Sequence, residues 1–221
     1  MASNSHGNNN ELEMANYLNN KKYSELNLTM KEFVKYICQT RELPLSENTV
    51  ILSRYESNNK LKQDIYITIE NVEMGISLKM GSGNSCHQEK IEDFISFIKA
   101  ETNASNEICD LWRLFIWADA TLDGSGPTTI GSDGKIACRC GTTKFKQKYP
   151  EERKVLQQYL DENIEALITH SVFVGEHNSN VDFVYHGTYK QGRWISKQEV
   201  IDFQKTKIGC AKRACLYLGS L

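Results

Sequence analysis

Asp64 and Lys79 are residues whose types and spacing could support hydrolysis of a phosphodiester bond. Asp64 opens an alternating apolar run over residues 65–69, and Lys79 lies near the end of a second run over residues 75–80. A short polar stretch separates the runs, so we expect two antiparallel strands that place the acid beside the lysine. Carboxylates bind Mg²⁺, and a neighbouring lysine can orient water or neutralise developing charge.

The residue two before the lysine faces the same side of the strand, because strand side chains alternate. Here that residue is Ser77, so the pair lacks a second acid on the hairpin itself. Each residue also has an ordinary explanation, with Asp64 as a turn residue and Lys79 as a solvated strand-end lysine. Glu89, in turn, is explained by the preference of acids for the first turn of a helix.

The elements that must position the hairpin follow from hydrophobic periodicity. Helices are predicted over residues 11–19, 29–40, 107–118 and 154–170. A further helix is predicted to follow Ser85, which we expect to cap its N-terminus together with Gln88. Strands are predicted over residues 50–55, 65–69, 75–80, 183–186 and 192–195. Ser196 is expected to cap a last short helix. Mixed strands and helices of this kind predict an α/β fold with a central mixed β-sheet flanked by helices.

The length allows one large globular domain or two small ones, and we expect one. The chain has 221 residues, 40% of them hydrophobic and 24% charged. We expect residues 1–10 to form a disordered tail and residues 11–221 a single domain, with the core motif in 11–99 and an accessory, DNA-contacting part in 100–221. No apolar run is long enough to cross a bilayer. Seven irregularly spaced cysteines favour reduced thiols and a cytoplasmic location.

The charges are segregated along the chain although the net charge is only −2. Residues 135–148 hold five basic residues and no acid, and residues 190–213 hold seven basic residues against two acids. Such stretches favour contact with a phosphate backbone, although solvated helix faces would have the same composition. The predicted DNA-binding residues are Lys144, Lys146, Lys148, Lys190, Arg193, Lys205 and Lys207.

The order of these features resembles the PD-(D/E)XK nuclease superfamily, which includes the type II restriction endonucleases. The resemblance lies in a helix with Glu11, a strand with Asp64, a strand ending in Ser77-Leu-Lys79, and a helix after Gln88-Glu89. It covers residues 11–99 and does not extend into the C-terminal half. Its motif is short and degenerate, and Ser77 departs from it, since the family pattern has Asp or Glu there.

The resemblance implies a role for each matching residue. Asp64 would be the metal-binding aspartate, Lys79 the motif lysine, and Glu11 the acid that some members carry on the first helix. In members without the motif acid, a glutamate from the following helix replaces it. Glu89 is the first candidate for that role and Glu92 the second. The implied catalytic set is therefore Asp64, Lys79, Glu89 and Ser77, and the metal set is Asp64, Glu89, Glu92 and Glu11.

The sequence thus predicts a Mg²⁺-dependent endonuclease of the restriction type that hydrolyses double-stranded DNA, with Mn²⁺ as an alternative metal. The resemblance alone suggests a homodimer, and we expect neither a membrane partner nor a small-molecule cofactor. Two alternatives stay open. One is a non-catalytic nucleic-acid-binding or regulatory protein on a degenerate nuclease fold, which Ser77 favours. The other is a nuclease that acts on RNA or on single-stranded or branched DNA.

Overall fold

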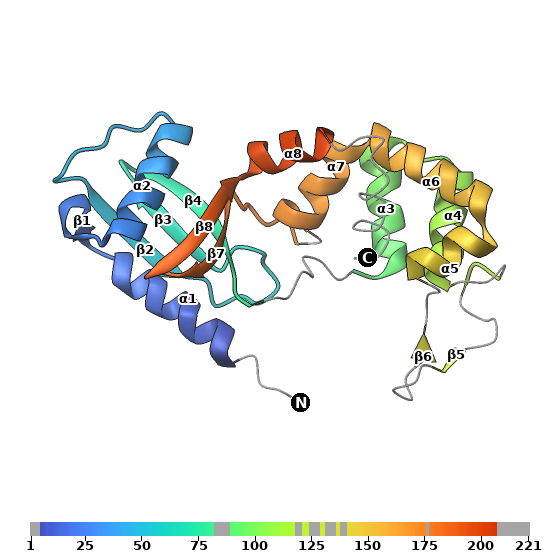
Figure 1. The fold of residues 1–221 in the computed structure, drawn as a ribbon, viewed down its shortest axis with the longest axis horizontal. Coiled ribbons are helices and arrows are strands. Elements are labelled where there is room, and N and C mark those ends of the chain that lie inside the picture. Colours follow the sequence, from blue (N-terminus) through green and yellow to red (C-terminus); the bar gives the residue numbers. More distant parts are fainter. Residues whose placement is uncertain are drawn as a thin grey trace. The chain divides into compact units, whose positions relative to one another are not determined.

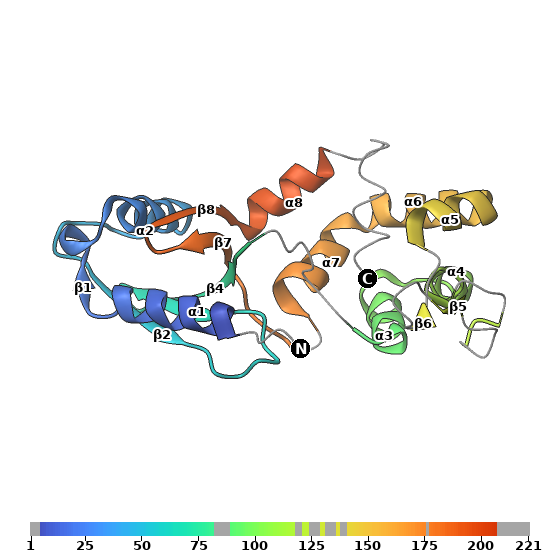
Figure 2. The ribbon, with the colours of Figure 1, turned by 60° about the horizontal axis from the view of Figure 1, so that its bottom comes forward.

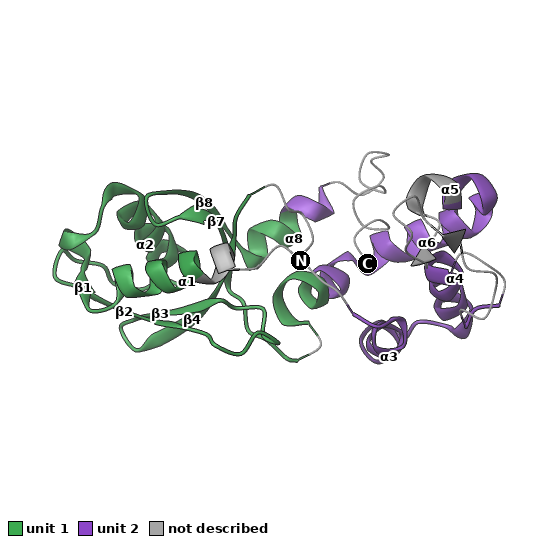
Figure 3. Ribbon diagram, turned by 90° about the horizontal axis from the view of Figure 1, so that it is seen from below, with its two compact units in different colours: residues 1–84, 169–202 green, residues 85–168, 203–221 purple. Residues whose placement is uncertain are grey.

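The computed structural model describes residues 5–81, 89–117, 121–123, 129–130, 136–137, 141–175 and 177–206. These residues form two compact units (Figure 3). Unit 1 comprises residues 1–84 and 169–202, and unit 2 comprises residues 85–168 and 203–221. Residues 85–168 of unit 2 are therefore inserted within the sequence of unit 1.

A six-stranded mixed sheet forms the centre of unit 1, in the order β1-β2-β3-β4-β7-β8 (Figure 1). The pairing of β4 with β7 is parallel, and all other pairings are antiparallel. This confirms the predicted α/β fold with a mixed sheet and flanking helices. The strands are β1 (Lys21–Lys22), β2 (Val50–Tyr55), β3 (Ile65–Ile69), β4 (Val72–Lys79), β7 (Phe183–Thr188) and β8 (Gln191–Ser196).

Helices α1 (Ser5–Leu18) and α2 (Leu28–Thr40) cover one face of this sheet (Figures 1 and 2). Their apolar side chains share one core with the alternate residues of the strands that face them, including Ile65, Ile67 and Ile69. Between α2 and the strands β7 and β8 this core is aromatic, because Phe33 of α2 packs against Phe183, Tyr185 and Trp194. Residues at the intervening strand positions consequently face the other side of the sheet.

The first helix begins earlier than predicted. It starts at Ser5 rather than Glu11, so part of the segment expected to be a tail is helical. A tertiary contact accounts for the difference, because Asn10 is buried and its side-chain amide donates a hydrogen bond to the carbonyl of Gly187 at 3.0 Å. Such a long-range contact leaves no mark in the local sequence pattern.

Unit 2 is helical around a second core that includes Phe94, Trp112, Phe145 and Leu156. Its helices are α3 (Ile91–Thr102), α4 (Asn106–Trp117), α5 (Gly141–Lys148), α6 (Pro150–Glu162) and α7 (Ile164–Ile168), and the short strands β5 (Thr129–Ile130) and β6 (Ile136–Ala137) pair with each other.

Two predicted helices of the second half differ from the structure. The helix predicted over residues 154–170 is divided, because the Asn163 side chain bonds to the Tyr159 carbonyl at 2.9 Å and α7 gives way to a π-helical segment, Thr169–Val174. The predicted cap at Ser85 lies outside the described residues, and α3 begins at Ile91 with Lys90 at its N-cap. Glu89 therefore precedes its helix.

The last helix, α8 (Lys197–Lys205), begins where predicted. Its Ser196 and Glu199 form a capping box, in which each side chain accepts a hydrogen bond from the backbone N–H of the other. Among the described residues, no helix combines the length and the apolar character that a membrane span needs. The two cysteines in the described part, Cys38 and Cys109, are buried free thiols.

Candidate active site

The hairpin of β3 and β4 brings Asp64, Ser77 and Lys79 together at one end of the sheet. Its turn is formed by Glu70 and Asn71, both at positive φ, as a tight two-residue hairpin turn requires. The register pairs Ile65 with Ile76, so Asp64 lies opposite Ser77. The expected placement of the acid beside the lysine is therefore observed, with Lys79 Nζ at 3.7 Å from Asp64 Oδ2.

The backbone hydrogen bonds between β3 and β4 end at Asp64, and beyond this point the Asp64 side chain accepts the hydrogen bonds from β4. The Asp64 N–H still donates to the Ile76 carbonyl at 2.9 Å. Beyond that bond, the Leu78 N–H donates to Asp64 Oδ2 at 2.5 Å, and the Ser77 hydroxyl donates to the same oxygen at 3.3 Å. The carboxylate therefore replaces the missing strand partner, which fixes its orientation.

All three of these interactions converge on one carboxylate oxygen. Oδ2 of Asp64 receives the Ser77 hydroxyl, the Leu78 N–H and the Lys79 ammonium, while Oδ1 receives none of them. The Asp64 side chain is about one-fifth exposed. Burial raises the pKa of Asp64, and Lys79, the Leu78 N–H and the Ser77 hydroxyl oppose that rise. The group is thus a partly desolvated carboxylate whose Oδ2 is fixed by its neighbours on β4.

Glu11 on α1 belongs to the same electrostatic environment. Its pKa is raised, first by burial and then by the negative charge of Asp64, whereas Lys79 lowers it. The pKa of Glu11 thus responds to the charges of Asp64 and Lys79, and its assignment to the metal stays a prediction. No group of three or more His, Cys, Asp or Glu residues suited to a metal occurs within the described residues. Mg²⁺ is commonly bound by only one or two carboxylates, so two acids fit this ion.

The other two predicted acids lie in unit 2. Both oxygens of Glu92 bind Arg113, at 2.8 and 2.7 Å, and this pairing lowers the pKa of Glu92. Arg113 lies on α4, so its pairing with Glu92 joins α3 to α4, and it also binds Asp110 of its own helix at 2.9 Å. Glu89 is half-buried just before α3. The assignments of Glu89 and Glu92 to the metal stay predictions, and the pairing with Arg113 gives Glu92 a structural role.

The predicted DNA-binding residues lie in both units. Lys190 and Arg193 are exposed on unit 1, at the β7–β8 turn and on β8. In unit 2, Lys146 and Lys148 are exposed on α5, and Lys205 forms an ion pair with Glu165 at 2.7 Å. The side chain of Lys144 and the whole of Lys207 lie outside the described residues.

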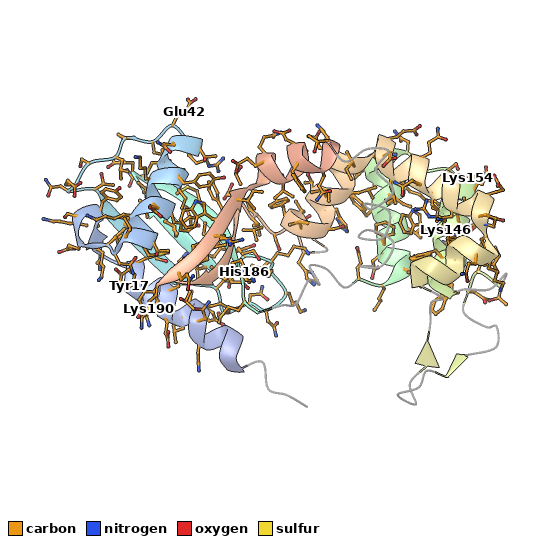
Figure 4. All side chains as sticks on the ribbon, viewed as in Figure 1. Tyr17, Glu42, Lys146, Lys154, His186 and Lys190 are labelled. Carbon is orange, nitrogen blue, oxygen red and sulfur yellow. The ribbon has the colours of Figure 1, made fainter. Side chains whose placement is uncertain are left out.

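The β7–β8 turn is fixed against α1 and the start of α2 (Figure 4). Tyr189 stacks on Tyr17 of α1 with ring centroids 4.5 Å apart, and the ammonium of Lys190 lies 5.5 Å from the centre of the Tyr189 ring. Side chains of Asn27 and Thr29 donate to the carbonyls of Tyr189 and Lys190. Lys190 is therefore presented by an ordered turn.

His186 of β7 lies beside Lys79 of β4. The parallel register of β4 and β7 pairs Lys79 with His186, and the His186 ring nitrogen Nε2 lies 2.8 Å from the Gly81 carbonyl oxygen. More than a hundred residues separate the two strands, including all the described helices of unit 2 up to α7. No local pattern could have indicated this pairing.

Comparison with known proteins supports the fold. No protein-family model matches the sequence, and no curated protein does. A crystal structure of the restriction endonuclease MspI in complex with its cognate DNA matches with a TM-score of 0.56. The match covers 83% of this chain and 68% of the MspI chain, at 14% sequence identity. The chain therefore has the fold of a restriction endonuclease, as the short motif led us to expect.

Proposed function

We propose that this protein is a Mg²⁺-dependent endonuclease that hydrolyses phosphodiester bonds of double-stranded DNA. The observation that carries the proposal is the arrangement at Asp64, where the Ser77 hydroxyl and the Leu78 N–H donate to Oδ2 and the Lys79 ammonium pairs with the same oxygen. That arrangement lies at the end of a hairpin in a sheet with the restriction-endonuclease fold. DNA is the proposed substrate because the matching enzyme was crystallised with its cognate DNA.

The residues divide the chemistry between them. Asp64 and Glu11 would hold Mg²⁺, which when bound would supply Lewis-acid stabilisation of the phosphate and an acidified water. Lys79 lies at the edge of the carboxylate pair, where its ammonium orients the attacking water and neutralises charge that develops on the phosphate. Ser77 holds Asp64 in position through its hydroxyl.

Exposed lysines and arginines on both units would bind the backbone. This role is proposed for Lys190, Arg193, Lys146, Lys148, Lys144, Lys205 and Lys207. Charge–phosphate contacts carry little sequence information, so we assign these residues to affinity rather than to the choice of site. A homodimer is proposed because cutting both strands of a duplex needs two active sites. Sedimentation in the presence of duplex DNA tests that part.

A second candidate function is a non-catalytic DNA-binding protein on the same fold. The observation that favours it is Ser77, which occupies the motif position of an acid and is itself 3% exposed. Its hydroxyl turns toward Asp64 and contributes no negative charge for a metal. The two candidates differ in one measurable property, which is turnover.

Cleavage of supercoiled plasmid DNA in Mg²⁺ or Mn²⁺ tests the proposal. Wild type should convert the plasmid to nicked and linear forms, and Asp64→Ala and Lys79→Ala should each lose about 10²–10³-fold in rate, as removal of one stabilising group commonly does. Lys154→Ala, on the exposed face of α6, is the matched control and should retain the rate. Absence of cleavage in either metal, with DNA binding intact, would favour the second candidate. RNA, single-stranded DNA and branched DNA belong in the same assay.

A further inference from the structure

Three basic residues of unit 1 form a row across neighbouring strands. The register pairs Lys79 of β4 with His186 of β7, and His186 with Arg193 of β8. Residues directly opposite one another on adjacent strands face the same side of a sheet. Lys79, His186 and Arg193 therefore share the face that carries Asp64 and Ser77. We call these three residues the basic row.

The members of the basic row have different surroundings. Lys79 pairs with Asp64 at 3.7 Å. Arg193 is exposed, and within the described part of the chain its guanidinium has no hydrogen bond or ion pair. A guanidinium that pairs with no acid of the described chain can donate its hydrogen bonds to a ligand. Its planar, forked set of donors suits bidentate binding of a phosphate group.

His186 has a structural partner in the chain that leaves β4. Its Nε2 lies 2.8 Å from the carbonyl oxygen of Gly81. A carbonyl can only accept, so Nε2 carries the proton and donates. Gly81 has a φ of +72° and follows Lys79 by two residues. The imidazole therefore holds the turn directly after Lys79 and fixes the end of the strand from which the lysine extends.

The charges around the row are polarised. Its Lys79 end adjoins the two carboxylates, Asp64 and Glu11, and its other end carries Arg193. Adjacent strands are about 4.8 Å apart, so the main chains of Lys79 and Arg193 are about 10 Å apart. This reach suits neighbouring phosphates of one strand, with the metal ligands at one end and a guanidinium at the other.

We propose that the basic row binds the DNA backbone beside the scissile phosphate, so that the cleaved strand crosses β4, β7 and β8 instead of running along them. Lys79 acts at the scissile phosphate and Arg193 binds a neighbouring phosphate. His186 is a positioning residue that keeps Lys79 directed at its phosphate through the bond to Gly81. The inference rests on the proposed function in taking DNA as the ligand and in placing the scissile phosphate at Lys79.

Binding without cleavage tests the role of Arg193. The affinity for a mixed-sequence 30-bp duplex is measured by fluorescence anisotropy in EDTA at several salt concentrations. Each lost phosphate contact lowers the slope of log K against log salt by about 1. Arg193→Ala should show that loss, whereas Arg193→Lys, which keeps the charge, and Lys154→Ala, in unit 2, should keep the wild-type slope. An Arg193→Ala slope equal to that of wild type, or a wild type that does not bind the duplex, would overturn the proposal.

A double-mutant cycle in the same assay tests the role of His186. Lys79→Ala should weaken binding about tenfold in wild type, equivalent to about 1.4 kcal/mol, and far less in His186→Phe, because the lysine is then no longer positioned. His186→Gln keeps a donor for the Gly81 carbonyl and should restore the full effect. Additive effects of Lys79→Ala and His186→Phe would refute the positioning role.

These measurements are independent of turnover. A wild type that binds the duplex with the expected slope but never cleaves DNA would refute the proposed endonuclease activity and support the basic row. A wild type that cleaves plasmid while Arg193→Ala keeps the full salt slope would support the activity and refute the row.

Discussion

The hydroxyl of Ser77 donates a hydrogen bond to Oδ2 of Asp64 across 3.3 Å, from the position where the superfamily motif has an acid. The residue that replaces the motif acid therefore acts on the remaining acid. Ser77 is buried, so its bond is shielded from competition with water. Loss of the hydroxyl would leave Oδ2 with the Leu78 N–H and the Lys79 ammonium alone.

Ser77→Ala should lower the cleavage rate about tenfold, because the Asp64 carboxylate gains freedom to rotate away from the metal position, an effect of about 1.4 kcal/mol. One lost hydrogen bond to a charged group should also destabilise the fold by about 1.5–3 kcal/mol. Plasmid cleavage and urea unfolding measure the two effects. A variant with the full cleavage rate would show that Ser77 only fills space beside Asp64.

Ser77→Asp restores the motif acid and should have opposite effects with and without metal. Two adjacent, partly buried carboxylates repel each other, so the metal-free variant should have a lower Tm than wild type. A divalent ion relieves that repulsion, so the rise in Tm on addition of Mg²⁺ should exceed that of wild type. Equal Mg²⁺-dependent shifts in the two proteins would contradict a metal position next to Ser77.

Asp64→Asn should be at least as stable as wild type in the absence of metal at neutral pH. Burial raises the pKa of Asp64, so the folded state binds this proton more tightly than the unfolded state does. Stability of the wild type relative to Asp64→Asn should therefore fall as pH rises from the ordinary carboxyl pKa through the raised value. Urea unfolding of both proteins in EDTA from pH 4 to pH 8 measures this difference.

Mg²⁺ should reverse that order of stability. At a concentration a hundred times its Kd, a ligand that binds only the folded state stabilises it by about 2.7 kcal/mol. Wild type should gain this amount at neutral pH, while Asp64→Asn should gain nothing. An equal gain in both proteins would place the metal away from Asp64.

The candidate acids should separate by their effect on Mg²⁺ affinity. Glu11→Gln should weaken binding at least about tenfold, because Glu11 shares the electrostatic environment of Asp64. Glu92→Gln should leave Mg²⁺ binding unchanged and cost no more than about 1 kcal/mol of stability, since Glu92 is a largely exposed partner of Arg113. Calorimetric titration with Mg²⁺ measures the affinity of each variant. Glu89→Gln belongs in the same series, because the sequence predicts Glu89 as a metal ligand.

Local patterns predicted the hairpin well and the rest of the site only in part. Alternation of apolar residues over 65–69, followed by a polar turn, sufficed to place Asp64 beside Lys79, because the pairing is between neighbouring segments. The capping box at Ser196 was predicted for the same reason. Both features are decided within a few residues of sequence.

Contacts across long sequence separations could not be predicted in this way. The parallel pairing of β4 with β7 joins Lys79 to His186 over an entire inserted unit. Periodicity identifies each strand but says nothing about its neighbour in the sheet. The helix start at Ser5 was missed for a similar reason, since it depends on the bond from Asn10 to Gly187.

Gly75 is the position where β4 tolerates no side chain, and it leads to a prediction on stability. A Cβ built there would lie 2.0 Å from the Asn180 carbonyl oxygen and 3.2 Å from Gln63 Cβ. The surrounding backbone is held in place, because the Gly75 N–H donates to Asp182 Oδ2 at 2.8 Å and the Gly75 carbonyl accepts from the Asp182 N–H.

Gly75→Ala should therefore destabilise unit 1 by about 1–3 kcal/mol or more, as overpacking does. Thermal unfolding measures the loss, and Gly81→Ala, where a Cβ meets nothing within 4 Å, is the comparison that isolates positive-φ strain from a steric clash. A Gly75→Ala Tm equal to that of wild type would show that residues 180–182 can move away from β4.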